Sequence, residues 1–540
     1  MLNRLSINSG AIAVARFVPI VLVLCVFGCG GSASPNIVPP PSRAATPTFS
    51  PSAGSYTGTQ TVTITSSTSG AILCWNTTGS PATNGTGTGC TTGISLTNGG
   101  SITVSVSETV YAVGGTSSLG DSIVGSAAYV ITASVSNSFG FQCSVNSAGC
   151  PYNGTDYTWP TTQAQPGVLR LWDASVQWNV LSTASGTYNW NDMDQWLDAI
   201  AANTPRAVIY TFGWTPFWDA PSGSPCQTES TRGSPCPPTD LTSSGSPTFN
   251  AFVTALVAHC SPAGNCVSTY IKYFELWNEA DTSVAWTGTV AQLYQMLAPA
   301  VSIITGAVSG VQILGPPLSD NTGTSVAWEC SWLAQEVSNG VLSNIYAFHV
   351  YMQNNTPETR LANALPQLSP NTSYSSTCSA SGWTAQPSWL TETNYANSSE
   401  PNPYACYTAL YNTNDCIGQI VRWQLLLNSN DVVNVTWYSW VPTIGSVSQN
   451  EAAYYYMMQY LSGGTLTAIC SSSGSPAVYT CPFIEGNGIL ALWVWTPSES
   501  GTSYTVPSGY TDYRDLGGGT TSITGGQTIT IGTEPFMLEI

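Results

Sequence analysis

Hydrophobic and polar positions follow two different periods along residues 139–464. Short apolar runs bounded by polar loops are typical of buried strands, and apolar residues recur with helical spacing between them. The strand candidates are FGFQC, GVLRLWD, RAVIYTFGW, IKYFELWNEA, VQILGPP, IYAFHVYM, PSWLTETN and VVNVTWYSW. Helical spacing is clearest in two sets: Phe249, Phe252, Val253, Leu256 and Val257, then Leu293, Met296, Leu297, Val301 and Ile304. Strands interleaved with helices in this number predict an α/β fold, a (β/α)8 TIM barrel over residues 139–464.

The chain on either side of this region has the pattern of β-rich modules. Residues 46–133 alternate in short β runs separated by Gly, Ser and Thr turns, which predicts an N-terminal Ig-like β-sandwich. Residues 465–540 return to strands, and we expect a C-terminal β-domain there. The structural alternative for the central region is a doubly wound open sheet. No Gly-rich phosphate-binding loop follows the first strand to support that alternative.

The first 29 residues predict a targeting segment. Arg4 and Arg16 precede the apolar run FVPIVLVLCVFG, which is too short to span a bilayer. The segment then reads VFGC, which resembles a bacterial lipoprotein signal peptide with Cys29 as the acylated residue. Residues 30–45 form a Pro/Ser tether. We expect an exported protein in the bacterial cell envelope or outside the cell, anchored to the membrane by lipid on Cys29. An ordinary cleaved signal is the alternative.

Cysteine usage agrees with export. Of 16 cysteines, Cys25 and Cys29 lie in the targeting segment, and most of the rest form close sequential pairs around short polar loops. These pairs are Cys74/Cys90, Cys143/Cys150, Cys226/Cys236, Cys260/Cys266, Cys406/Cys416 and Cys470/Cys481, with Cys330 and Cys378 left over. Because the chain lacks the CxxC spacing of zinc sites and has only 2 His, we expect local disulfides, no metal and no cofactor.

Composition narrows the class of partner. Lys and Arg number 10 against 28 Asp and Glu, so the net charge of −18 argues against nucleic acid. Only 7% of residues are charged, whereas Trp, Tyr and Phe number 19, 26 and 13. Neutral polar and aromatic surfaces suit neutral ligands such as sugars. We therefore expect a carbohydrate ligand and a monomeric protein.

Two glutamates are the strongest candidates for chemistry. In barrels of this kind catalytic residues stand at the C-terminal ends of strands. Glu279 ends the fourth predicted strand and Glu392 the seventh. Glycoside hydrolysis requires two facing carboxylates, one to protonate the leaving oxygen and one to attack the sugar or activate water. Glu275 lies deeper on the strand of Glu279, and we interpret it as a structural carboxylate held by Arg170.

The motifs around these glutamates point to a family. YFELWNEAD resembles the strand-four pattern FE-x-WNEP of glycoside hydrolase family 39, the clan A group of β-xylosidases and α-L-iduronidases. WLTETNY resembles the nucleophile strand of the same clan, and AFHVY and WYSW also fit. The resemblance covers residues 139–540 and departs from the pattern at Ala280, where the family has Pro. Separately, the N-terminal module resembles the Ig-like domain at the C-terminus of chitobiases and β-hexosaminidases.

That resemblance implies a retaining O-glycosyl hydrolase that acts on poly- or oligosaccharides by double displacement. Glu279 would be the acid/base and Glu392 the nucleophile, and Asn278 would bind the sugar 2-hydroxyl. The other implied site residues are Arg170, His349 and Tyr351, which would orient the carboxylates, and Trp437 or Trp440 as the sugar platform. An aromatic cluster in the loop after the third strand, including Trp214 and Trp218, also suits a sugar face.

Two other functions remain open from the sequence. One is a non-catalytic carbohydrate-binding lipoprotein on a barrel scaffold, which the presence of both carboxylates disfavours. The other is a transglycosylase, which would use the same site and exclude water from the covalent intermediate. A serine hydrolase fits poorly because no GxSxG is present and few His are available as bases.

Overall fold

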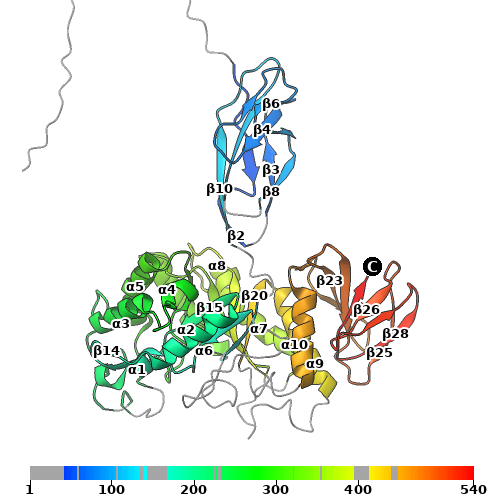
Figure 1. Cartoon of the computed structure of the whole chain (residues 1–540). Helices are drawn as coiled ribbons and strands as arrows, with labels where there is room; N and C mark the ends of the chain where they lie inside the picture. The colour runs from blue at the N-terminus through cyan, green and yellow to red at the C-terminus, as the bar shows by residue number, and fades with distance from the viewer. Residues whose placement is uncertain are drawn as a thin grey trace, which may run out of the picture. The chain divides into compact units, whose positions relative to one another are not determined.

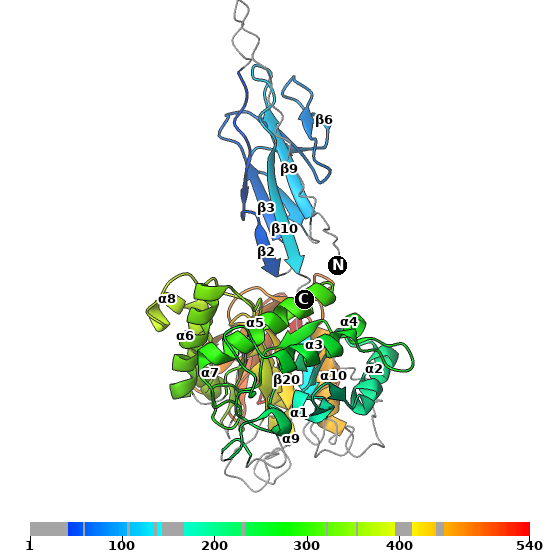
Figure 2. The same cartoon turned by 90° about the vertical axis from the view of Figure 1, so that its left-hand side faces the viewer.

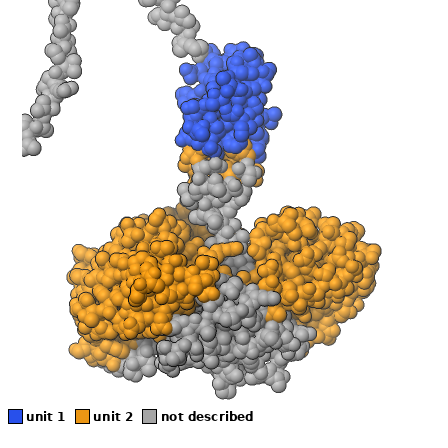
Figure 3. All heavy atoms as spheres, in the orientation of Figure 1, with its two compact units in different colours: residues 1–50, 63–101, 110–126 blue, residues 51–62, 102–109, 127–540 orange. Residues whose placement is uncertain are grey.

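The computed structural model describes residues 42–57, 60–104, 108–132, 138–142, 167–223, 225–227, 233–319, 322–352, 355–394, 413–438 and 448–540 (Figure 1). The chain divides into two compact units, coloured blue and orange in Figure 3. One contains residues 1–50, 63–101 and 110–126, and the other contains residues 51–62, 102–109 and 127–540. The predicted targeting segment and most of the tether lie outside the described residues.

The β runs predicted between residues 46 and 133 are strands. A three-stranded sheet has the order β1-β3-β8, a five-stranded sheet the order β2-β10-β9-β4-β7, and β5 pairs with β6. Their bounds are β1 Thr48–Ser50, β2 Gly54–Thr57, β3 Gln60–Thr65, β4 Ile72–Asn76, β5 Ala82–Thr83, β6 Cys90–Thr92, β7 Ile94–Thr97, β8 Ser101–Val104, β9 Glu108–Gly115 and β10 Gly125–Thr132. Leu73 and Val113 are buried, as apolar residues that face the inside of a sheet should be. The Ig-like grouping of these strands stays a prediction.

The eight strands predicted for the central region form one parallel sheet in the order β17-β16-β15-β12-β11-β20-β19-β18. Their bounds are β11 Ser138–Gln142, β12 Val168–Leu171, β15 Ala207–Thr211, β16 Tyr273–Glu275, β17 Gln312–Leu314, β18 Tyr346–His349, β19 Ser388–Thr393 and β20 Val432–Tyr438. Parallel bridges Leu314–Ile345 and Leu318–Phe348 connect the segments at the two ends of this order. Parallel strands bring their carboxyl ends to one edge, where the candidate residues were expected.

One predicted strand is shorter in the structure. The run IKYFELWNEA forms β16 only over Tyr273–Glu275, and the chain then turns. Glu279 therefore lies in the turn beyond the strand, which corrects its predicted place at the strand end. Trp277 and Glu279 have φ angles of 66° and 46°, which no residue of an extended strand adopts.

Helices occupy the connections between these strands. The longer helices are α2 Asn191–Asn203, α3 Pro247–Ala258, α5 Val290–Ala307, α6 Thr322–Asn339, α7 Pro357–Thr372, α9 Thr413–Asn428 and α10 Ser448–Leu461. The short elements are α1 Trp178–Leu181, β13 Ser182–Ala184, β14 Thr187–Tyr188, the 3-10 turn η1 Phe217–Asp219, α4 Val267–Tyr270 and α8 Tyr374–Thr377. The apolar faces that the helical spacing predicted on α3 and α5 are buried in the core, and the two helices lie side by side in Figure 2.

Capping residues explain where α3 and α5 begin. Ser246 precedes α3 and accepts a hydrogen bond from the backbone of Phe249, and Pro247 stands at the first helical position. Thr289 and Gln292 form a capping box at the start of α5. By length and composition α5 is apolar enough to cross a membrane. Because its apolar residues pack in the core, core packing accounts for that composition.

The C-terminal segment is a β-domain, as predicted. A seven-stranded sheet has the order β21-β23-β24-β29-β26-β27, with β22 paired to β23, and β25 pairs with β28. The bounds are β21 Thr465–Leu466, β22 Ser471–Ser473, β23 Val478–Ile484, β24 Leu490–Trp495, β25 Thr502–Thr505, β26 Asp512–Arg514, β27 Thr520–Ser522, β28 Thr528–Ile531 and β29 Phe536–Glu539. Glu358 of α7 ties this domain to the helices, since it accepts hydrogen bonds from Arg422 of α9 and from the indole of Trp495.

The predicted short-range disulfides are present wherever the structure describes both cysteines. The bonds are Cys74–Cys90, Cys226–Cys236, Cys260–Cys266 and Cys470–Cys481, and the two left-over cysteines form Cys330–Cys378. The expected pairs Cys143/Cys150 and Cys406/Cys416 lie outside the described side chains. Each bond lowers the conformational entropy of the unfolded chain, which stabilises a fold with little charge pairing.

Candidate active site

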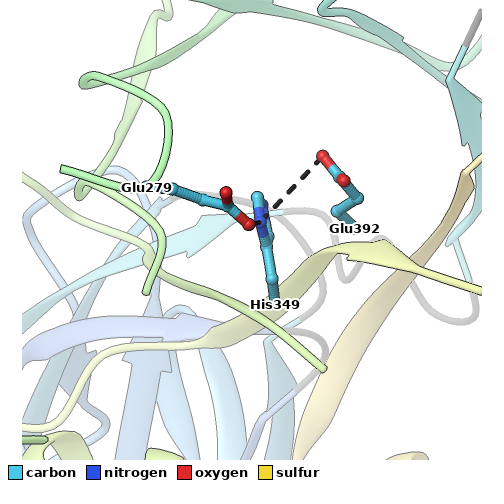
Figure 4. A group of neighbouring side chains, drawn as sticks. All are labelled: Glu279, His349 and Glu392. Atoms are coloured by element: carbon cyan, nitrogen blue, oxygen red, sulfur yellow. Dashed lines mark hydrogen bonds and ion pairs between the residues drawn. The ribbon is translucent and has the colours of Figure 1, made fainter. Parts of the chain in front are cut away.

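Glu279, His349 and Glu392 meet at the carboxyl edge of the central sheet. His349 is the last residue of β18 and is the register partner of Glu392 on β19, so strand pairing alone brings these two together. Nδ1 of His349 lies 2.9 Å from Oε1 of Glu279 and 4.0 Å from Oε2 of Glu392. One polar atom from each of the three side chains lies within 4.8 Å of the other two. Figure 4 shows the two carboxylates approaching the imidazole from different sides.

A buried arginine links this group to the interior of the sheet. Nη1 of Arg170 donates to Oε2 of Glu392 at 2.8 Å, and Nε donates to Oε2 of Glu275 at 2.8 Å. Nη2 donates to Oε2 of Glu275 at 2.5 Å and to Oδ1 of Asn278 at 2.6 Å. Burial by itself would lower the pKa of Arg170, but the charges of Glu275 and Glu392 outweigh burial and raise the pKa above its ordinary value. Arg170 therefore stays a cation shared by two carboxylates, and the predicted contact with Glu275 is present.

Tyr351 holds the other oxygen of Glu392. Its hydroxyl donates a hydrogen bond to Oε1 of Glu392. Burial, and then the charges of Glu392 and Glu279, raise the pKa of Tyr351 well above its ordinary value, so the phenol keeps the proton it donates. With Arg170 on Oε2 and Tyr351 on Oε1, both oxygens of Glu392 accept hydrogen bonds that fix the orientation of its carboxyl group.

The turn that carries Glu279 is held from three directions. The backbone N–H of Asn278 donates to the carbonyl of Phe212, and the indole of Trp277 donates to the carbonyl of Ala285. Asp281 accepts hydrogen bonds from the backbone N–H and the hydroxyl of Ser319, at 2.9 Å and 2.6 Å, and from Ser325. These contacts hold the positive φ angles at Trp277 and Glu279, a backbone state that persists only where surrounding structure enforces it.

The sequence did not predict that Asp281 and its two serine partners hold the turn that carries Glu279. Asp281 lies inside the motif that was singled out, so its proximity to Glu279 was visible. Ser319 and Ser325 lie about forty residues away and carry no pattern of their own. Thr211, the register partner of Glu275, was also missed, and its hydroxyl donates to Oε2 of Glu275 at 2.8 Å.

The two glutamates differ in their exposure. The side chain of Glu279 is 26% exposed, whereas the side chain of Glu392 is 8% exposed and His349 is fully buried. A partly exposed carboxyl group is able to exchange its proton with solvent, and an enclosed carboxylate fixed by two donors is suited to attack. Oxygens of the two glutamates and the imidazole could also ligate a divalent cation. Arg170 already compensates the charge of Glu392, which weakens the case for a metal at this place.

The aromatic residues that were predicted to contact the sugar differ in their burial. Trp437 is fully buried in the core, so it presents no ring face to a ligand, in contrast to the predicted sugar platform. Trp440 lies outside the described residues. Trp214 is buried, and the centroid of its ring lies 4.8 Å from the centroid of the Trp172 ring. Trp218 is 38% exposed, and its indole N–H donates to the carbonyl of Ser182. Among the three that the structure describes, Trp218 is the most exposed.

Comparisons with known proteins agree with the fold. No family model matches the chain, and no curated protein matches it. A family 39 glycoside hydrolase from the gut symbiont Bacteroides cellulosilyticus WH2 is similar in structure at 14% identity, with a TM-score of 0.52 over 92% of this chain and 100% of that chain. A glucosidase from Croceicoccus marinus is similar at 13% identity, with a TM-score of 0.49 over 74% of this chain and 94% of that chain. The likeness to the family 39 enzyme confirms the predicted resemblance at the level of the fold.

Proposed function

We propose that the chain is a retaining glycoside hydrolase, built on a (β/α)8 barrel over residues 139–464. The observation that carries this proposal is the short separation of Glu279 and Glu392, whose nearest oxygens lie within 4.8 Å. Closely spaced carboxyl groups favour retention, because an inverting enzyme needs a wider separation between them to admit a water molecule. The fold likeness to glycoside hydrolases supports the same class of reaction.

The reaction proceeds by double displacement. A carboxylate oxygen of Glu392 attacks the anomeric carbon while Glu279 donates its proton to the leaving oxygen, so the glycosidic bond breaks as the glycosyl–Glu392 ester forms. Glu279, now ionised, removes a proton from water. That water attacks the anomeric carbon, and the ester bond to Glu392 breaks. Each step inverts the anomeric centre, and the product retains the configuration of the substrate.

The neighbouring residues have positioning roles in this scheme. Arg170 and Tyr351 each donate a hydrogen bond to one oxygen of Glu392 and so fix both oxygens relative to the sugar. Nδ1 of His349 lies 2.9 Å from Oε1 of Glu279 and 4.0 Å from Oε2 of Glu392, so the imidazole is close to both carboxyl groups. Transfer of the proton from Glu279 changes the charge beside the imidazole in each half-reaction. The amide of Asn278, oriented by Arg170, is placed to bond a sugar hydroxyl.

We also propose that the protein is exported and lipid-anchored through Cys29. The disulfides support an oxidising compartment, because such bonds persist where thiols are not kept reduced.

Hydrolysis of a panel of aryl glycosides tests the proposed activity. The purified chain should release the aryl group from at least one member, and thin-layer chromatography should show free sugar rather than transfer products. Glu279→Gln and Glu392→Gln should each remove turnover of substrates with poor leaving groups. Glu499→Gln, at an exposed carboxyl of the C-terminal domain, is the matched control and should retain full activity. Carbohydrate binding without release of any aryl group would contradict the proposal.

A further inference from the structure

A groove of about 460 Å³ lies among α5, α6 and the turn that precedes α3, and it shares no residue with the candidate active site. Its volume is that of a small-ligand site. Amide side chains line it at Gln295, Gln335 and Asn339, and hydroxyl groups line it at Ser244 and Ser302. Such groups donate and accept hydrogen bonds without carrying charge.

The walls of the groove are fixed before any ligand arrives. Gly245 has a φ of 100°, and a Cβ there would lie 2.9 Å from Cγ of Pro299, so the turn is pressed against α5. Backbone hydrogen bonds in both directions between Thr242 and Gly245 close that turn. On the other side, the hydroxyl of Tyr294 donates to the carbonyl of Gly340 at 2.8 Å, which ties α5 to the end of α6. A groove held in this way orders little on binding, which lowers the entropic cost of a ligand.

Two neighbouring residues of α5 add apolar surface to the groove. Pro299 and Ala298 both line it, next to the amide side chain of Gln295. The groove therefore combines neutral hydrogen-bonding groups with a small apolar surface, as sugar rings do.

The charge around the groove favours a neutral ligand. Among its described lining residues only Tyr294 is ionisable, and burial followed by the charge of Glu336 raises the pKa of Tyr294. The lining therefore stays neutral, and the net charge of −18 repels anions. We propose that this groove is a second, non-catalytic carbohydrate site, which binds a short stretch of a neutral polysaccharide. The ligand class rests on the proposed function.

Affinity electrophoresis tests this site separately from catalysis. The full chain carrying Glu392→Gln is run in native gels with arabinoxylan, mixed-linkage β-glucan or galactomannan, and with polygalacturonate as the anionic comparison. At least one neutral polysaccharide should retard the chain. Ser302→Trp, which fills the groove, should weaken the apparent affinity about fivefold or more, since loss of one or two hydrogen bonds accounts for such a factor. Gln335→Ala combined with Asn339→Ala should act in the same direction.

Ala307→Trp is the matched control, because Ala307 is exposed at the end of the same helix and does not line the groove. It should leave retardation unchanged, and thermal melts should show that both tryptophan variants fold. Three results would each overturn the proposal. The first is that no neutral polysaccharide retards the chain, and the second is that both tryptophan variants lose retardation equally. The third is that polygalacturonate retards the chain more strongly than the neutral polysaccharides do. Aryl glycoside hydrolysis should be the same with and without Ser302→Trp. If the unmodified chain hydrolyses no aryl glycoside while Ser302→Trp still weakens retardation, the proposed catalysis fails and the groove stands.

Discussion

Arg170 donates a hydrogen bond of 2.8 Å from Nη1 to Oε2 of Glu392 while its Nε and Nη2 hold Glu275. One buried guanidinium thereby connects a structural carboxylate of β16 with the proposed nucleophile on β19. Only a planar group with several donors in a fixed geometry satisfies these acceptors together. Glu392 is consequently oriented by the same residue that pairs with the buried Glu275.

Arg170→Lys should lower kcat/KM by about 10–100-fold, the factor for one charge-assisted hydrogen bond. A lysine keeps the charge but has one nitrogen in place of the fork, so it is unable to hold Glu275 and Glu392 together. Arg514→Lys is the control, since Arg514 pairs with Glu539 at 2.8 Å in the C-terminal domain. A kcat/KM of Arg170→Lys at the wild-type level would contradict the assigned role.

Tyr351→Phe should lower kcat/KM by about tenfold or more, because Glu392 loses the hydrogen-bond donor on Oε1. Tyr438→Phe is a matched comparison, since the hydroxyl of Tyr438 donates to Asp173 at 3.2 Å rather than to Glu392. The account requires kcat/KM to fall in Tyr351→Phe and to stay near the wild-type value in Tyr438→Phe.

Glu336→Gln should change how stability depends on pH. Burial raises the pKa of Glu336 to about 7, although hydrogen bonds from Ser343 and Leu342 act in the opposite direction. The folded chain therefore holds a proton that the unfolded chain has lost between about pH 4.5 and 7, so stability falls as pH rises through this window. A shift of this size corresponds to about 3 kcal/mol.

The glutamine variant should keep that stability, because its amide is neutral at every pH and its oxygen still accepts from the backbone of Leu342 and Ser343. Denaturant titrations of both proteins at pH 4.5 and pH 8 measure the difference. Glu499→Gln, at an exposed position, should leave the pH dependence as it is. Equal losses of stability between pH 4.5 and pH 8 in wild type and Glu336→Gln would show that the buried carboxyl group is not the cause.

Cys29→Ser should release the protein from the membrane fraction or block its processing, as expected for loss of the lipidated residue. Cys25→Ser, four residues earlier in the same segment, is the control and should leave anchoring intact. Detergent-phase partitioning of the three proteins is the measurement. Partition of Cys29→Ser with the detergent phase at the wild-type level would count against the lipid anchor.

Several features were predictable because local patterns determine them. The apolar runs and their polar boundaries identified the strands of the central sheet, and helical spacing identified the buried faces of α3 and α5. Strand ends then pointed to His349 and Glu392, which pair in register. Other features depend on tertiary contacts. Asp281 and residues distant in sequence hold the turn at Glu279. The local pattern does not show these contacts, so it predicted a strand that continues through the turn.

The burial of Trp437 and of Glu336 likewise depends on tertiary contacts. Trp437 follows an alternation that fits either a core residue or a ligand platform, and packing from several elements decided for the core. Glu336 looks like a solvent-facing residue of a helix, yet the segment around Ser343 covers it and supplies three hydrogen bonds. Burial of this kind is a property of the packed chain and leaves no local sequence signal.

Azide rescue separates the roles of the two glutamates. Glu392→Gly should abolish turnover, and azide should restore cleavage of an activated aryl glycoside with inverted configuration because it replaces the missing nucleophile. Glu279→Ala should retain activity mainly on good leaving groups, which need no proton, and azide should give a product of retained configuration. Substantial activity of Glu392→Gly without azide would show that Glu392 is not the nucleophile.

The anomeric configuration of the first-formed product, followed by NMR during hydrolysis by the wild-type chain, tests the central claim most directly. The proximity of Glu279 and Glu392, with oxygens within 4.8 Å, predicts that this product has the same configuration as the substrate before mutarotation. A first-formed product of inverted configuration would contradict the double displacement and the assignment of Glu392 as nucleophile.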